Sequence, residues 1–262
     1  MGKLKGFLFF LLVLAAVVGG GVIGLRYSRD KVAPVIEVKP NLVATKHMGS
    51  IYVYGARVGD HVILFDSGAD SAAHPVDAIL TQLKASHADV KDIFLTHGHF
   101  DHVAGALQFP DARTYLGAGD VGLATGKESP DGLLVKLMTA VLAAPPLPRI
   151  TNPLKEKAAV DVGGGKSVLA IPVPGHTRGS FAYLFDGVLF PGDIMLLKEG
   201  RLEPTPSMFD AHPEENRASI RALKKQLADQ TIDRVCTAHG GCTPAGLGEN
   251  MLNDLVNRLG GG

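Results

Sequence analysis

The stretch THGHFDHVAG, residues 96–105, decides the fold of this chain. Within six positions it carries three histidines and one aspartate, namely His97, His99, Asp101 and His102. If residues 97–99 are extended, the imidazoles of His97 and His99 point to one side, because side chains alternate along a strand; Asp101 and His102 then begin a helix that faces the same side. Burying these groups uncompensated is costly, and adjacent imidazoles repel each other when protonated, so we expect a bound divalent cation. A histidine-rich surface loop is the alternative that this stretch alone leaves open.

Four more candidate residues follow predicted strands and lie close to glycines. They are Asp66 in DSGAD, His176 in PGHTRGS, Asp193 in PGD and His239 in TAHGG. Any one of them alone would more often be a turn or capping residue. Together they form a consistent set, and glycine is the residue that lets backbone approach a crowded centre where a Cβ would clash.

Strands and helices occur in two similar halves, which predicts two packed sheets with helices outside. We expect strands at 62–65, 93–96 and 113–116 in the first half and at 167–173, 181–185 and 188–190 in the second. Two-residue hairpin turns are expected at Gly59-Asp60 and Asp186-Gly187. Amphipathic helices are expected at 75–84 and 216–229.

An apolar insertion is expected at about 120–153. Ser129 is a good N-cap and Pro130 suits a first helical position, so we predict a helix of about 14 residues that ends before Pro145. One face of that helix is apolar: Leu133, Leu134, Leu137, Met138, Val141 and Leu142. This stripe either packs on the domain core or forms a lid that faces substrate or membrane.

The N-terminal segment, residues 1–30, differs in kind from the rest. Phe7 to Leu25 is 19 residues without a charge, long enough to span a bilayer core of about 30 Å as a helix. A retained membrane anchor is favoured over a cleaved signal peptide, because no Ala-x-Ala site follows it. Basic residues flank both sides, so the positive-inside rule discriminates little. The short basic tail favours export of the domain at 31–262, anchored at the membrane, with secretion after cleavage as the alternative.

Composition limits the partners of that domain. Lys+Arg and Asp+Glu are balanced at 26 each, and Trp is absent, so a nucleic acid is not an expected partner. A small molecule is the expected substrate, and a lipophilic one if the apolar stripe of the insertion forms a lid. The chain has two cysteines, Cys236 and Cys242, which form either a short-loop disulfide or two free thiols. Oligomeric state is not predicted.

At this point the chain resembles the metallo-β-lactamase superfamily over about residues 40 to 245. The family's five motifs occur in order: Asp66; His97-x-His99-x-Asp101-His102; His176; Asp193; His239. The resemblance implies an α/β fold, the four-layer αββα sandwich, with a two-metal site on one edge. It implies that His97, His99 and His176 hold one ion, that Asp101, His102 and His239 hold the other, and that Asp193 bridges both. Asp101 and Asp66 receive catalytic roles, Asp101 as a ligand and Asp66 by orienting a ligand through a hydrogen bond.

The expected chemistry is hydrolysis by a hydroxide that bridges two metal ions. Zinc is the default for such ligands, although iron and manganese also accept them. Because β-lactamases of this superfamily generally lack the bridging aspartate and glyoxalase II enzymes carry a further helical domain, an ester, lactone or thioester hydrolase is the favoured interpretation. Alternatives are a mononuclear-iron sulfur dioxygenase, a β-lactamase or phosphodiesterase, and an inactive membrane-tethered scaffold. Five histidines match no ligand position: His47, His61, His74, His87 and His212.

Overall fold

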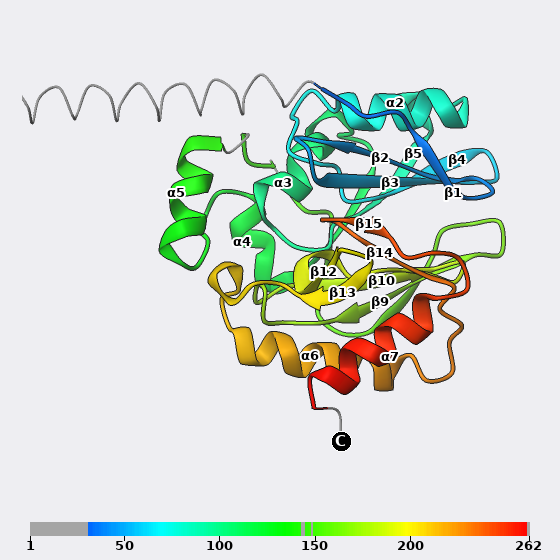
Figure 1. The fold of residues 1–262 in the computed structure, drawn as a ribbon. Coiled ribbons are helices and arrows are strands. Elements are labelled where there is room, and N and C mark those ends of the chain that lie inside the picture. Colours follow the sequence, from blue (N-terminus) through cyan, green and yellow to red (C-terminus); the bar gives the residue numbers. More distant parts are fainter. Residues whose placement is uncertain (1–30, 143–144, 148, 261–262) are drawn as a thin grey trace, which may run out of the picture.

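The computed structural model of the chain describes residues 31–142, 145–147 and 149–260. Two β-sheets face each other in the middle of the molecule, with α2 (His74–Leu83) on the outer side of one and α6 (Pro213–Gln226) and α7 (Gly248–Arg258) on the outer side of the other (Figure 1). The predicted αββα sandwich is therefore confirmed.

The first sheet has seven strands in the order β1 to β7. These are Ile36–Lys39, Leu42–His47, Ile51–Val58, His61–Phe65, Val90–Phe94, Arg113–Gly117 and Asn152–Leu154. The strands from β1 to β4 pair antiparallel and those from β4 to β7 pair parallel. Parallel strands are covered on both faces, which explains why β4, with the sequence HVILF, is almost continuously apolar.

The second sheet has six strands in the order β15-β14-β11-β10-β9-β8. In chain order they are β8 Ala158–Asp161, β9 Ser167–Pro172, β10 Phe181–Phe185, β11 Val188–Phe190, β14 Arg234–Thr237 and β15 Gly241–Cys242. Between β11 and α6, a separate two-stranded sheet forms from β12 (Met195–Lys198) and β13 (Arg201–Pro204).

Both predicted hairpin turns are confirmed. Val58 pairs with His61 across the first and Phe185 pairs with Val188 across the second. In the second turn Asp186 and Gly187 have φ of 51° and 76°, the positive values that a two-residue turn matching the strand twist requires.

Three apolar clusters fill the three spaces between the four layers. One lies between the sheets, one between the first sheet and α2, and one between the second sheet and α6 with α7. Aromatic rings dominate the inter-sheet cluster: Phe65 on β4 stacks on Phe190 of β11 with ring centroids 3.9 Å apart. This central contact joins the two sheets and so holds their strand ends in register.

The insertion folds differently from the sequence expectation. Its helices are α4 (Val121–Ala124) and α5 (Leu133–Leu142), so the helix begins three residues after Pro130 and Ser129 is not its N-cap. Gly132 has φ of +79°, a left-handed conformation that no helical residue adopts, and its carbonyl accepts the hydrogen bond from the Lys136 N–H. The helix therefore starts only after this glycine.

The two cysteines form the disulfide that the sequence left open, and the expected membrane anchor is not among the described residues. Cys236 and Cys242 are joined by a disulfide across β14 and β15. The expected anchor at residues 1–30 lies outside the described residues. Among those that are described, no helix is both long and apolar enough to cross a bilayer.

We expect Phe65→Ala to lower the free energy of unfolding by about 3–5 kcal/mol, because it removes a fully buried ring from the inter-sheet contact. Urea denaturation of purified protein measures this. Ile36→Ala is the matched control: Ile36 is 50% exposed on the edge strand β1, and its truncation should change stability by about 0.5 kcal/mol or less. Equal losses in the two variants would show that the stacked rings do not hold the sheets together.

Candidate metal centre

The candidate ligands gather at one end of the sandwich because each follows the carboxyl end of a strand. The loop after β5 carries His97 and His99 and leads into α3 (Phe100–Val103). His176 lies in the loop after β9, Asp193 lies in a 3₁₀ turn after β11, and His239 lies between β14 and β15. The structure thus brings all seven predicted ligands together.

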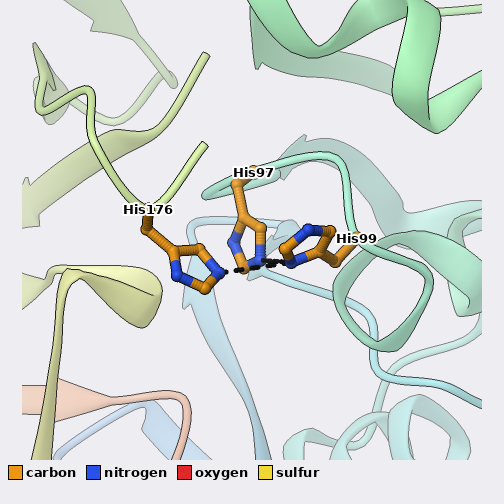
Figure 2. Close-up of side chains that lie close together, drawn as sticks. All are labelled: His97, His99 and His176. Atoms are coloured by element: carbon orange, nitrogen blue, oxygen red, sulfur yellow. Dashed lines mark hydrogen bonds between the residues drawn. The ribbon is translucent and has the colours of Figure 1, made fainter. Parts of the chain in front are cut away.

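His97, His99 and His176 form the first cluster (Figure 2). His99 Nδ1 lies 2.9 Å from His97 Nε2 and 3.2 Å from His176 Nε2. The rings of His97 and His176 meet at 90°, so the three nitrogens point toward a common centre. Nitrogens around a tetrahedral zinc, each about 2.0–2.1 Å from the ion, lie about 3.3 Å apart, which is close to the spacing here.

Asp101, His102 and His239 form the second cluster. Asp101 Oδ2 lies 3.7 Å from His102 Nε2 and 3.8 Å from His239 Nε2. Asp193 Oδ2 lies 3.2 Å from His239 Nε2, 3.5 Å from His102 Nε2 and 3.8 Å from His176 Nε2. A single carboxylate therefore reaches nitrogens of both clusters, as the predicted bridging position requires.

Burial keeps His97 and His99 of the first cluster neutral. It holds the pKa of His97 well below its ordinary value, with the neighbouring imidazoles adding to the effect, and it lowers the pKa of His99 to about 3. Both imidazoles therefore carry no charge at neutral pH. The neutral ring is the form that binds a metal ion.

The second cluster has the opposite electrostatics. Burial alone would lower the pKa of His102, but the carboxylates of Asp193, Asp66 and Asp101 raise it well above its ordinary value. Asp193 likewise raises the pKa of His239. Although burial works against the charge of Asp193, the imidazoles of His239 and His102 hold its pKa well below the usual range. Asp193 is thus an anion at the centre of the site.

Two buried atoms in this centre show that the side chains alone do not complete it. His102 Nε2 and Asp193 Oδ1 have no hydrogen-bond partner within the described part of the chain. Buried polar atoms are rarely left unpaired. Nitrogen and carboxylate oxygen donors at this spacing suit a divalent ion such as zinc, so these residues fit a pair of metal ions.

Asp66 holds His102 from behind. Its Oδ2 lies 2.8 Å from His102 Nδ1 and accepts the Thr96 hydroxyl at 2.9 Å, while Oδ1 accepts the Thr96 N–H at 2.7 Å. With Nδ1 engaged in this way, His102 presents Nε2 to the second cluster. The predicted orienting position of Asp66 agrees with these contacts, and such partners fix the tautomer and direction of a ligand.

Asp210 orients the ring of His176, as Asp66 orients that of His102, and it was not predicted from the sequence. Asp210 Oδ1 lies 3.0 Å from His176 Nδ1, and Oδ2 accepts the Asn216 side-chain amide at 3.1 Å. The carboxyl is 2% exposed. It comes from the segment before α6, where no strand end or glycine pattern marks it.

Asp120, also missed, ties the two loops of the first cluster together. Its buried carboxylate accepts the N–H of Gly98 at 2.8 Å, the N–H of Gly179 at 2.8 Å and the hydroxyl of Thr177 at 2.6 Å. Burial raises the pKa of Asp120 even against these donors. Asp66 was identified from the sequence because it is an aspartate that follows a predicted strand. Asp120 comes soon after β6, so the same criterion could have identified it.

Glycines let the ligand loops pack against neighbouring backbone. A Cβ on Gly175, whose φ is +133°, would lie 2.2 Å from the Asn216 backbone nitrogen. One on Gly240, whose φ is +118°, would lie 2.0 Å from the Leu197 carbonyl oxygen. No side chain fits at either place, so the glycines beside His176 and His239 are structural requirements of the site.

The other histidines lie outside the clusters; they are His47, His61, His74, His87 and His212. Two of them pair with carboxylates away from the clusters: His74 with the buried Asp70 and His87 with the partly exposed Asp77, each at 2.6 Å. That these five do not bind the metal stays a prediction.

Comparison with known proteins adds the family context. A family model for the metallo-beta-lactamase superfamily matches residues 44–239. The chain is 32% identical over 160 residues to a hydroxyacylglutathione hydrolase of Acidiphilium cryptum, covering 60% of this chain and 55% of that protein. It is 27% identical over 234 residues to the probable metallo-hydrolase YflN of Bacillus subtilis, covering 75% of this chain and 82% of that protein.

Among solved structures, the fold is similar to BJP-1, a subclass B3 metallo-β-lactamase of Bradyrhizobium japonicum. The TM-score is 0.64 at 22% identity, with 89% of this chain and 94% of that chain covered. At this identity the likeness concerns the fold alone. The chain spans about half the length of the hydroxyacylglutathione hydrolases that it matches, 55% in the Acidiphilium protein.

We expect Asp210→Ala to lower zinc affinity ten- to hundredfold, because His176 loses the acceptor that orients its ring. Asp210→Asn, which keeps one acceptor oxygen, should fall between this variant and wild type. Competition with a chromogenic chelator measures the affinity. Asp77→Ala is the control, since it removes a similar contact to His87 at the surface. A folded Asp210→Ala that binds zinc as tightly as Asp77→Ala would rule out the orienting role.

Proposed function

The chain belongs to the metallo-β-lactamase superfamily, and from this premise we propose that it is a metal-dependent hydrolase that cleaves an ester, lactone or thioester bond. One observation carries the proposal: the carboxylate of Asp193 lies within 3.8 Å of imidazole nitrogens from both ligand clusters. Such sharing is the arrangement of two-metal hydrolytic sites.

The proposal assigns two zinc ions to this centre. His97, His99 and His176 would hold the first, Asp101, His102 and His239 would hold the second, and Asp193 would contact both. When bound, such a pair supplies an activated water at neutral pH and polarises the carbonyl group of the substrate. The neutral state of His97 and His99, and the anionic state of Asp193, are the protonation states that this assignment needs.

The remaining residues position and support this chemistry. Asp66 and Asp210 hold the rings of His102 and His176, and Asp120 fixes the loops on which His99 and His176 lie. Because Cys236 and Cys242 are bonded to each other and are the two cysteines of the chain, no thiol is available as a nucleophile. The similarity to hydroxyacylglutathione hydrolases supports an acyl substrate, since acyl glutathiones are thioesters.

The proposal extends to location. We place the domain on the exported side of a membrane, anchored by residues 7–25 or released after cleavage of that segment. The disulfide between Cys236 and Cys242 supports an oxidising compartment, because such bonds are rare in reducing cytosol.

The test is hydrolysis by the zinc-loaded full chain, assayed with an acyl thioester, a lactone, a cephalosporin and a phosphodiester. We expect turnover of the thioester or the lactone, and a loss of more than about tenfold in kcat, or 1.4 kcal/mol, in Asp193→Ala. His74→Gln, a histidine outside the clusters, is the control and should match wild type. Turnover that survives in Asp193→Ala with both ions bound, or turnover of only the cephalosporin or phosphodiester, would overturn the proposal.

A further inference from the structure

An apolar cavity of about 250 Å³ opens onto both ligand clusters. Five ligand residues form part of its wall: His99, Asp101, His176, Asp193 and His239. Most of the remaining wall is apolar and comes from three separate elements: Val135 and Met138 of α5, Leu196 of β12, and Pro206 and Phe209 at η5 (Ser207–Phe209). A concave apolar surface with a few convergent polar groups is the usual form of a small-molecule site.

Helix α5 is available for this role because much of its apolar side is not packed on the core. Leu137, Met138 and Val141 are 57%, 39% and 41% exposed. The helix stands at one end of the sandwich, beside α3 and α4 (Figure 1). The exposure of these three side chains speaks against packing of the stripe on the core, and Met138 is the one of them that lines the cavity.

A second cavity of about 270 Å³ has a different chemistry. It shares His99 and His176 with the apolar cavity, but its other walls include the charged side chains of Glu128, Asp131 and Arg178. The Arg178 guanidinium lies 3.7 Å from the Asp131 carboxylate, and both side chains are about half exposed or more. A polar and an apolar space therefore meet at the same two imidazoles.

We propose that the apolar cavity binds the acyl chain of the substrate, so that the substrate is a straight-chain acyl compound with a polar leaving group in the second cavity. This inference rests on the proposed hydrolysis. The scissile carbonyl then lies at His99 and His176, where the two cavities meet. The hydrocarbon chain lies against Met138, Leu196 and Phe209, and its burial discriminates between chain lengths. Methionine suits such a wall because its flexible side chain adapts to chains of different length.

Two measurements on the zinc-loaded full chain test this assignment. The first is hydrolysis of thioesters of N-acetylcysteamine, from acetyl to octanoyl, which vary the chain and keep one polar leaving group. We expect kcat/KM to rise by about fourfold for each added CH₂, the factor that burial of a methylene implies. The second is calorimetric binding of straight-chain carboxylates, the acyl products, whose affinity should rise with chain length in the absence of any turnover.

Met138→Trp fills the apolar cavity from the side of α5. It should lower kcat/KM for the octanoyl thioester at least tenfold more than for the acetyl thioester, and weaken octanoate binding correspondingly. Leu137→Trp is the matched control, because Leu137 is the adjacent residue of the same exposed helix and does not line the cavity. It should keep the wild-type dependence on chain length.

The outcomes separate this inference from the function on which it rests. If the protein hydrolyses thioesters but kcat/KM for the octanoyl thioester is less than about ten times that for the acetyl thioester, the hydrolase proposal stands and the assignment of the acyl cavity is wrong. The assignment of the acyl cavity would also be wrong if Met138→Trp and Leu137→Trp lost the dependence of kcat/KM on chain length equally, or if both variants kept it. If longer carboxylates bind more tightly but no acyl compound is hydrolysed, the cavity assignment stands and the hydrolase proposal is wrong.

Discussion

Asp193 Oδ2 lies between imidazole nitrogens that come from three different loops, 3.2 Å from His239, 3.5 Å from His102 and 3.8 Å from His176. This shared, buried anion joins the two ligand clusters. An isolated carboxylate in such a place would be too costly to ionise, and the imidazoles around it are what hold its pKa low. The three segments that carry these residues converge because the strands before them end at the same edge of the sandwich.

Around this centre, a set of buried carboxylates keeps the ligands from moving. Asp66 fixes His102, Asp210 fixes His176, and Asp120 joins the loop of His99 to the loop of His176. Each lies on a segment distant in sequence from the group that it holds. The rings are thus oriented by hydrogen bonds already present in the fold, which is how a site retains its geometry before a ligand arrives. Two cavities of different polarity adjoin this centre and share His99 and His176.

Local signals in the sequence, apolar strands and polar residues at strand ends, predicted two packed sheets with outer helices and the seven candidate ligands. The four-layer sandwich and the division of the ligands between two ions came from the resemblance to the metallo-β-lactamase superfamily. Asp210 and Asp120 could not be recognised in the same way. Their hydrogen bonds join residues 34 and 57 positions apart, and such pairs become visible only when separately folded loops meet. The start of α5 was misplaced for a different reason: Ser129 and Pro130 form a plausible local cap, but the positive φ of Gly132 prevents a helix from running through it.

The most direct test of a shared two-metal centre is anomalous diffraction from crystals of the zinc-loaded full chain, measured on both sides of the zinc absorption edge. The account predicts two zinc peaks about 3.5–4 Å apart. The first should be contacted by His97, His99 and His176, the second by Asp101, His102 and His239, and Asp193 should contact both. A single peak at full zinc loading, or two peaks of which Asp193 contacts only one, would contradict it.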